Sequence, residues 1–391
     1  MDIDELAGRL APHYSHFDVA DRLLFTGHSH QAWPDAAREG LLEAWEAAAG
    51  EVDAKWERAF EKVDVLRGYL RDWYDDPDGL WCRGENTHTL LVSWLSALDL
   101  PSNPRVVTTD AEFHSMARQL KRLEEEGVTV DRAKADPDSL VRQLGKLLER
   151  PAAALMLSRV WFESAVVNRR LPEIAALARE RGVPLLVDDY HGTNVVPLSL
   201  REAGMEDCYL LVGGYKYLQW GEGNCFLRYP TGCGLRPVVT GWFADFGSLD
   251  RPQEGPVAYG EEHMRFASGT FDPAPVFRAA AVVEFFRAQG LTPQVLRRQY
   301  RAQVGLLREC FRETGLNPDS IRLLHERPLD QTGGFLALQA PRAREIRAEL
   351  MRRGVWTDAR GEVLRMGPAP YTTSDQIREA VGLLAEAVRS L

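Results

Sequence analysis

The pattern of apolar and polar residues divides the chain into three parts. Residues 34–75 carry apolar side chains at three- and four-residue spacing, so we expect helix there, beginning at Pro34. From about residue 80 to 270, short strand-like apolar runs alternate with amphipathic helical segments. From about residue 276 the pattern returns to long helices, followed by a short mixture of strands and helices. The chain therefore combines a central α/β region with helical and mixed regions on either side.

The central region predicts a mostly parallel sheet. Its strand-like runs are separated by helical segments such as 171–182. Strands that alternate with helices at this spacing form a parallel sheet with helices on both faces. We expect a sheet of the seven-stranded type, whose clearest strands are 105–110, 127–133, 152–160, 184–192 and 208–214.

The last third of the chain predicts a smaller α+β domain. Its expected helices are 275–290, 293–315, 342–354 and 374–391, and its expected strands are 333–341 and 362–370. We predict an N-terminal segment at 1–60 that joins the small domain, a large α/β domain at 61–275, and a C-terminal small domain at 276–391.

The composition is that of an ordinary globular protein. The chain has 391 residues, of which 45% are hydrophobic and 27% charged, and this length suits a large domain with a smaller one. The formal net charge of −10 leaves no basic stripe for nucleic-acid phosphates. The five cysteines form no CxxC pair, which argues against a zinc site and a disulfide framework. An acidic, amphipathic N-terminus and the lack of a long apolar run predict a cytoplasmic protein without a membrane segment.

Polar residues follow three of the predicted strands, at the edge where parallel sheets bind ligands. Because these strand ends meet at one edge, we expect their side chains to form one site. The residues are Asp188, Asp189 and His191 in one segment, Glu112, Phe113, His114 and Ser115 in a second, and Tyr215 and Lys216 in a third.

Lys216 is unusual, because the other five of the six lysines lie in segments typical of solvated helix faces. A lysine at one strand end and Asp188 at another are what a pyridoxal phosphate enzyme needs. The amine forms a Schiff base with the cofactor's aldehyde, and the carboxylate keeps the pyridine nitrogen protonated. Burial beside a cationic ring would lower the pKa of Lys216 and make it a usable base. The spacing alone fits equally well a lysine that extends from a strand end into solvent.

The segment 83–100 predicts a helix whose N-terminus suits a phosphate. Thr87 and Thr89 precede an apolar helical run, so backbone N–H groups and hydroxyls would face an anion. An ordinary helix cap explains the same residues. Taken alone, Phe113 and Asp189 are explained as a core aromatic and a hydrogen-bonded structural carboxylate.

Four segments, in the same order along most of the chain, resemble kynureninases of the class V aminotransferase branch of fold type I pyridoxal phosphate enzymes. Each motif is short, and their joint occurrence is specific. The resemblance implies the fold type I architecture, with a mostly parallel sheet in the large domain and a smaller α+β domain. The segments are VDDYHGTNVVPLSL at 187–200, GGYKYLQWGEGNCFL at 213–227, VVTGWF at 238–243 and GVWTDARGEVLRMGPAPYTTSDQI at 354–377.

The resemblance also implies roles for individual residues. Lys216 would carry the cofactor, and Asp188 would hold its pyridine nitrogen. His191 would lie beside the ring's phenolic oxygen or the substrate carboxylate, and Phe113 would stack on the ring. Arg365 would bind the substrate's α-carboxylate through a bidentate contact. Further cofactor-binding residues of the same chain would be Thr87, His88, Thr89, Ser115 and Tyr215. The resemblance also implies a homodimer with shared active sites, in which Trp242 and Thr270 would bind the cofactor of the neighbouring subunit.

The chain departs from the family pattern in ways that concern the substrate more than the cofactor. It has GHSHQ at 27–31 where the family shows GNSLG, and FHSM at 113–116 where the family's turn ends in aspartate. Thr270 replaces an asparagine expected near the substrate's aromatic ring. We predict His28 as a substrate-binding residue. His28, His30 and His88 are candidates for a pocket around the substrate's aromatic ring that differs from the family's. Each is equally well explained as a helix-capping or packing residue.

By this resemblance the protein is expected to hydrolyse L-kynurenine or 3-hydroxykynurenine, a step of tryptophan catabolism, to L-alanine and an anthranilate. Lys216 would be the base and Tyr215 the acid. Transamination or epimerisation of an amino acid is the alternative, whereas desulfuration fits less well because no mobile cysteine loop is visible. A dehydrogenase would need a G-x-G-x-x-G segment, which the chain lacks. A non-catalytic binding module would require a vestigial cofactor site.

Overall fold

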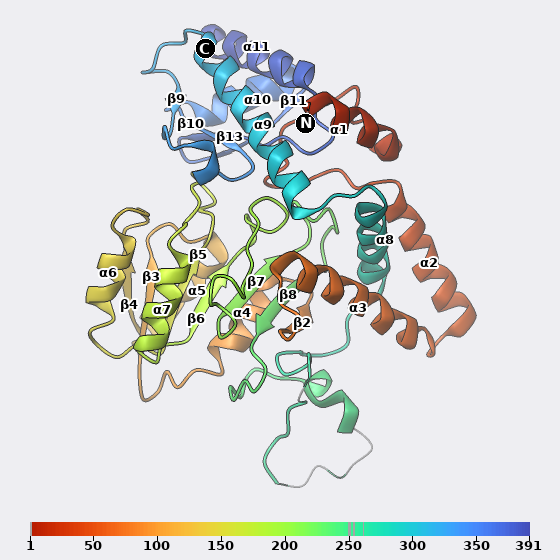
Figure 1. The fold of residues 1–391 in the computed structure, drawn as a ribbon, viewed down its shortest axis with the longest axis vertical. Helices are drawn as coiled ribbons and strands as arrows, with labels where there is room; N and C mark the ends of the chain where they lie inside the picture. Colours follow the sequence, from red (N-terminus) through yellow and green to blue (C-terminus); the bar gives the residue numbers. More distant parts are fainter. Residues whose placement is uncertain (1, 249–251, 253–254, 261) are drawn as a thin grey trace.

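The computed structural model describes residues 2–248, 252, 255–260 and 262–391. Figure 1 shows a central sheet surrounded by helices, with a C-terminal domain at one end of the molecule. The segment that carries the short helix η2 (Trp242–Ser248) lies at the opposite end. The N-terminal helix α1 (Ile3–Leu10) lies beside the C-terminal domain. No helix in the described part of the chain is long and apolar enough to cross a membrane.

The central sheet confirms the predicted α/β class. Its strand order is β2-β8-β7-β6-β5-β3-β4. The pairs from β7 through β4 are parallel, whereas β8 pairs antiparallel with both β2 and β7. The strands are β2 (Leu80–Gly84), β3 (Arg105–Thr109), β4 (Thr129–Ala133), β5 (Ala154–Ser158), β6 (Leu185–Asp188), β7 (Tyr209–Gly213) and β8 (Cys225–Tyr229).

Both faces of the sheet are buried, because side chains alternate between them along each strand. In β5, Leu155 and Leu157 belong to one apolar cluster, and Ala154 and Met156 belong to another. The first cluster includes α6 (Leu140–Leu147) and α7 (Leu171–Glu180), and the second includes α4 (Thr87–Leu95) and α5 (His114–Glu125). Helices on both faces leave the carboxyl ends of the strands as the open edge.

The helix expected over 34–75 is two helices, α2 (Ala36–Glu51) and α3 (Lys55–Tyr74). Val52 interrupts them with a φ of 48°, a left-handed conformation that an α-helix cannot include and that β-branched residues rarely adopt. The expectation of helix throughout, starting at Pro34, was therefore wrong at the start and at this break. Both helices pack against α8 (Ala274–Ala288).

The C-terminal domain is built around a four-stranded sheet in the order β12-β13-β10-β9. The N-terminal strand β1 (Leu23–Leu24) pairs in parallel with β11 (Val355–Trp356), so the start of the chain lies against this domain. The domain boundaries near residues 60 and 275 stay predictions. The remaining elements are η1 (Ala11–Phe17), α9 (Pro293–Glu313), β9 (Arg322–Leu323), η3 (Leu329–Gln331), β10 (Leu336–Gln339), α10 (Ala343–Arg352), β12 (Asp358–Arg360), β13 (Val363–Met366) and α11 (Ser374–Ser390).

Candidate active site

A cavity of about 300 Å³ lies at the carboxyl ends of β6 and β7, the edge at which the sequence predicted a site. This volume falls at the lower end of the range of cofactor and small-molecule sites. The predicted site residues that line it are Thr87, His88, Phe113, Ser115, Asp188, His191, Tyr215 and Lys216.

Lys216 is buried and lines this cavity. It follows the last residue of β7, Gly213, by a short turn, and only 5% of it is exposed. Its Nζ lies 2.9 Å from Nε2 of His191 and 4.6 Å from the centre of the Tyr190 ring. Burial lowers the pKa of Lys216 to about 7, an effect that Asp188 opposes. A large fraction of this amine is therefore unprotonated at neutral pH, as a nucleophile or a base requires.

Asp188 and Asp189 are adjacent but have different partners. Asp188 ends β6, lines the cavity and accepts a hydrogen bond from the backbone N–H of Tyr190 at 2.9 Å. Burial raises the pKa of Asp188 to about 6. Asp189 is fully buried and accepts hydrogen bonds from Arg159 Nε at 2.6 Å and from the Tyr74 hydroxyl at 2.5 Å. Asp188 therefore presents its carboxylate to the cavity, whereas Asp189 is a structural carboxylate.

The N-terminus of α4 forms another wall. Thr87 and His88 line the cavity in the first turn of the helix, where free N–H groups and the helix dipole suit an anion. Asn86 caps the helix by accepting hydrogen bonds from the backbone N–H of Thr89 at 2.9 Å and from its hydroxyl at 3.1 Å. The Thr89 hydroxyl thus belongs to the helix cap, and its contact with a phosphate stays a prediction.

Phe113 and Ser115 lie where the chain enters α5. The Phe113 ring packs edge-on against Phe162, with ring centres 5.3 Å apart, and its centre is 5.1 Å from Nζ of Lys216. An aromatic ring that lines the cavity near the lysine is placed to stack on a flat ligand bound there. Ser115 lines the same cavity from the first turn of α5.

Tyr215 lies between two other rings beside the cavity. His30 stacks on it with ring centres 4.8 Å apart, and the ring of Tyr190 is 5.1 Å away. His30 also contacts Glu222, which lines the cavity and whose Oε1 is 3.5 Å from the imidazole Nε2, and its Nδ1 is 3.2 Å from the hydroxyl of Ser29. Burial raises the pKa of Tyr215 above its ordinary value, so its hydroxyl keeps its proton at neutral pH and can donate it.

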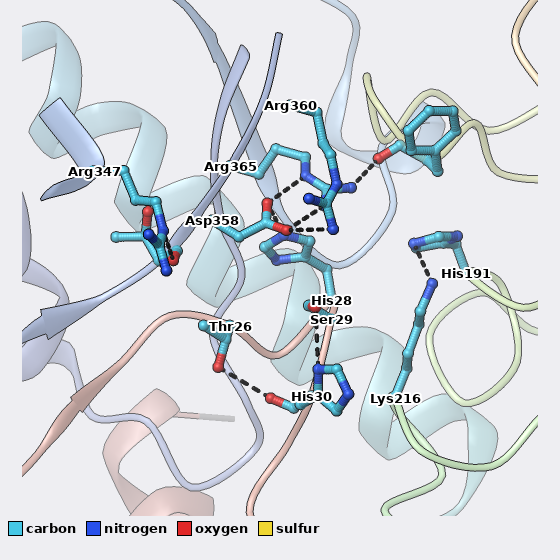
Figure 2. A network of polar contacts seen from close by, with 12 residues as sticks. Thr26, His28, Ser29, His30, His191, Lys216, Arg347, Asp358, Arg360 and Arg365 are labelled. Carbon is cyan, nitrogen blue, oxygen red and sulfur yellow. Dashed lines mark hydrogen bonds and ion pairs between the residues drawn. The ribbon is translucent and has the colours of Figure 1, made fainter. Parts of the chain in front are cut away.

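Arg365, the predicted carboxylate clamp, is bound by Asp358 (Figure 2). Its Nε and Nη2 donate to the two oxygens of Asp358 at 2.7 and 2.6 Å, and its Nη1 donates to the carbonyl of Phe162 at 2.5 Å. Arg365 lies outside the lining of the cavity but close enough to lower the pKa of Lys216. It therefore lies at the rim of the site with part of its guanidinium already engaged.

His28 binds Asp358 and lies outside the lining of the cavity, so its contact with a substrate stays a prediction. Its side chain is fully buried, and its Nε2 lies 3.2 Å from Oδ1 of Asp358. Burial lowers the pKa of His28 to about 4, so the neutral ring donates from Nε2 to the carboxylate. Burial alone would raise the pKa of Asp358, but the hydrogen bonds from His28 and Arg365 hold it well below its ordinary value. Asp358 is therefore a permanent anion behind Arg365.

Trp242 and Thr270 also lie outside the lining of this cavity. Thr270 lines a smaller cavity of about 50 Å³ together with Arg67 and Phe243. Trp242 packs on Phe243, with ring centres 4.2 Å apart, and is 47% exposed. Their contact with the phosphate of a neighbouring subunit stays a prediction.

Glu112 was expected at this edge of the sheet without a specific role, whereas the sequence did not single out Ser158 or Asp358. Glu112 is buried and accepts hydrogen bonds from the Thr109 hydroxyl at 2.5 Å and the Ser158 hydroxyl at 2.6 Å. Ser158 lines the cavity and is in register with Asp188 on the adjacent strand. The position of Ser158 at the end of β5 was the signal that could have identified it.

Comparisons with known proteins bear on the fold and on the family likeness of the chain. Residues 296–384 match the family model of the kynureninase C-terminal domain. The chain is 24% identical over 341 residues to the uncharacterized aminotransferase YcbU of Bacillus subtilis (strain 168), which covers 84% of this chain and 85% of that protein. A C-DES mutant with glycine covalently linked to its PLP cofactor has a TM-score of 0.81 and 18% identity, covering 96% of this chain and 98% of that one. The cysteine desulfurase CsdA of Escherichia coli has a TM-score of 0.80 and 16% identity, covering 98% of this chain and 99% of that one.

These findings confirm the predicted fold and the predicted resemblance. The solved structures establish the fold type I architecture over nearly the whole chain. The match to the kynureninase C-terminal domain covers the segment that contains Asp358 and Arg365, whereas Lys216 lies outside it. The family match thus contains Asp358 and Arg365 but none of the residues that line the cavity.

Proposed function

We propose that the protein is a pyridoxal phosphate-dependent hydrolase that cleaves the Cβ–Cγ bond of L-kynurenine or 3-hydroxykynurenine to L-alanine and an anthranilate. The observation that carries this proposal is the buried amine of Lys216, 2.9 Å from His191 and in one cavity with Asp188. The match of residues 296–384 to the kynureninase C-terminal domain favours this activity over others of the class.

The residues of the cavity fit the cofactor. Lys216 offers an amine of lowered pKa, Asp188 a carboxylate for the pyridine nitrogen, and Phe113 an aromatic face. Thr87 and His88 at the N-terminus of α4 would hold the phosphate. When bound, pyridoxal phosphate supplies an electron sink for the bonds broken at the substrate. The PLP-linked C-DES structure, which shares the fold, supports the assignment.

Lys216 and Tyr215 would move the protons of the reaction. The Lys216 amine, with a pKa of about 7, can take a proton from the substrate's Cα and return it near neutral pH. Burial lowers the pKa of His191 well below its ordinary value, so His191 can hold a hydrogen bond as a neutral ring. The protonated hydroxyl of Tyr215 would donate a proton to Cβ as the Cβ–Cγ bond breaks.

Arg365 would bind the substrate's α-carboxylate, and Asp358 would orient it. A guanidinium has five N–H donors, and the contacts of Arg365 with Asp358 and Phe162 use three of them. One N–H on each Nη remains, which suits a bidentate contact with a carboxylate. Because the bidentate ion pair fixes the plane of the guanidinium, Asp358 is a positioning residue.

Cysteine desulfuration is disfavoured by the thiols of the chain. Of the five cysteines, all of which the structure describes, Cys225 alone lines the cavity. Burial raises the pKa of Cys225 to about 11, so its thiolate, the form that would attack sulfur, is scarce at neutral pH. The segment 354–377, at the rim of the site, contains no cysteine.

Product analysis tests the proposal. The cofactor-loaded protein is incubated with L-kynurenine, and we expect alanine and anthranilate in equal amounts, the latter measured by its fluorescence. A Lys216→Ala variant should give neither product. A keto acid from kynurenine would instead identify transamination, an inverted α-carbon would identify epimerisation, and sulfide from cysteine would identify desulfuration.

A further inference from the structure

A second, open cavity of about 670 Å³ lies beside the active site. We call it the arginine groove, because Arg344 and Arg347 of α10 and Arg360 of β12 line it. Trp356 of β11 and His30 are also part of its lining. Asp358, which orients Arg365 in the proposed reaction, belongs to the same lining.

The groove holds positive charge that is only partly neutralised. Within the described ranges, Arg344 and Arg347 have no carboxylate at ion-pair distance, and the side chain of Arg347 contacts only the carbonyl of Thr357, at 3.4 Å. Arg360 is 3.3 Å from Asp358, an anion already bound to Arg365, and 44% of its side chain is exposed. Unneutralised guanidinium groups in a chain of net charge −10 favour an anionic ligand.

Other arginines of α10 show that this lack of partners is local. Arg352 and Arg353, at the end of the same helix, both pair with Glu349. Arg342, just before the helix, pairs with Glu345. These three arginines, which do not line the groove, thus have carboxylate partners, whereas Arg344 and Arg347 do not within the described residues.

The groove also offers an aromatic surface. Trp356 is 41% exposed, although large aromatic side chains usually bury most of their area. Met351 lines the groove beside it. An exposed indole and a thioether next to guanidinium groups suit a ligand with a flat ring and an acidic group, since the ring can stack while the acid binds arginine.

His30 and Asp358 separate the groove from the active site (Figure 2). His30 lines the groove and stacks on Tyr215, which lines the active-site cavity. In the view of Figure 2, Arg347 lies on the side of Asp358 away from Lys216. Arg360 is nevertheless close enough to affect the pKa of Lys216. The linings of the groove and of the active-site cavity therefore touch at His30 and Tyr215.

We propose that the arginine groove binds an aromatic carboxylate as it leaves the active site. This inference rests on the proposed function. In that hydrolysis the oxygen of water forms a bond to Cγ, the Cβ–Cγ bond breaks, and Cβ receives its electron pair and a proton. The resulting aromatic acid loses a proton to solvent and becomes an anion. The ring of kynurenine carries no charge at neutral pH, so the groove would select the product over the aromatic end of the substrate.

Direct binding of anthranilate tests this site without turnover. Anthranilate is titrated into the cofactor-loaded protein and its dissociation constant is measured by fluorescence. The double variant Arg344→Gln/Arg347→Gln should bind it about tenfold more weakly, because two charge-assisted contacts are lost. The charge-matched control Arg352→Gln/Arg353→Gln, on the same helix, should bind it as the unaltered protein does. Neutral 2-aminoacetophenone should bind both double variants equally.

Three outcomes would overturn the inference. They are an unchanged dissociation constant in the groove variant, an equal loss in the control variant, and groove-dependent binding of inorganic phosphate without binding of anthranilate. Kynurenine cleavage is measured in parallel, so that the two claims are tested separately. If the protein cleaves kynurenine but binds anthranilate equally well without the groove arginines, the proposed function is supported and the proposed role of the groove is contradicted. Groove-dependent anthranilate binding without cleavage would support the groove and contradict the proposed function.

Discussion

The Nζ atom of Lys216 lies 2.9 Å from Nε2 of His191, across the ends of two adjacent parallel strands. Burial lowers the pKa of both groups, and the charge of Lys216 lowers that of His191 further. Two cations so close in a buried site would repel each other, so the pair carries at most one positive charge near neutral pH. This contact joins the residue proposed to carry the cofactor to the one proposed to bind its ring oxygen.

The first prediction concerns the pH dependence of cofactor attachment. Only the neutral amine can attack an aldehyde, and the pKa of Lys216 is about 7 instead of its ordinary 10.5. The neutral fraction therefore rises with pH through about 7 and is nearly complete above about pH 8. We expect the rate at which the cofactor-free protein regains its visible band with pyridoxal phosphate to follow this curve. A rate that keeps rising to about pH 10 would show that Lys216 has an ordinary pKa.

The second prediction concerns the carboxylate clamp. Arg365→Gln should raise KM for the amino-acid substrate by about thirtyfold or more, because an unpaired buried carboxylate costs roughly 2–5 kcal/mol. The visible spectrum of the cofactor should stay nearly unchanged. Asp358→Asn keeps the shape of the side chain but weakens the ion pair that orients Arg365. We therefore expect a smaller rise in KM and an unchanged visible spectrum of the cofactor. Normal KM in the Arg365 variant would remove this residue from the site.

The third prediction separates the two adjacent aspartates. Asp189→Asn weakens a buried ion pair with Arg159, in which both side chains are almost fully buried, and leaves the arginine charge uncompensated. We expect it to lower the free energy of unfolding by about 3–5 kcal/mol, measured with urea. Asp188→Asn should leave stability nearly unchanged and reduce turnover strongly, because the pyridine nitrogen loses its anionic partner. Equal destabilisation by both changes would contradict this division.

The sequence predicted the sheet and most of the residues that line the cavity. Both predictions depend on patterns that can be read within short segments of the chain. The alternation of strands and helices predicted a parallel sheet, and the carboxyl ends of parallel strands lie together. The position of Asp188, His191 and Lys216 after strands was therefore enough to place them at one edge of the sheet. The break at Val52 was missed because apolar spacing continues across it. Asp358 was missed because its contact with His28 joins residues 330 positions apart, and no periodicity reports such a pairing. The stacking of His30 on Tyr215 was missed for the same reason.

The fourth prediction concerns assembly. Two large aromatic side chains are exposed side by side at Trp242 and Phe246, with exposed fractions of 47% and 40% and ring centres 5.5 Å apart. Such exposure is typical of surfaces that another chain covers. We predict a two-fold homodimer with a total interface of roughly 2,000 Å² or more, in which Thr270 serves the neighbouring active site. Sedimentation should show a dimer. An inactive Lys216→Ala chain mixed with an inactive Thr270→Trp chain should regain partial activity, and an active monomer would contradict the shared site.

The most direct test of the central claim is to identify the residue that carries the cofactor. The protein loaded with pyridoxal phosphate is reduced with borohydride and digested, and the modified peptide is identified by mass spectrometry. We predict a single phosphopyridoxyl adduct on Lys216, the one of six lysines that lines the cavity. The Lys216→Ala variant should yield no adduct while keeping the urea unfolding midpoint of the unaltered chain. An adduct on any other lysine, or none in the unaltered protein, would contradict the account.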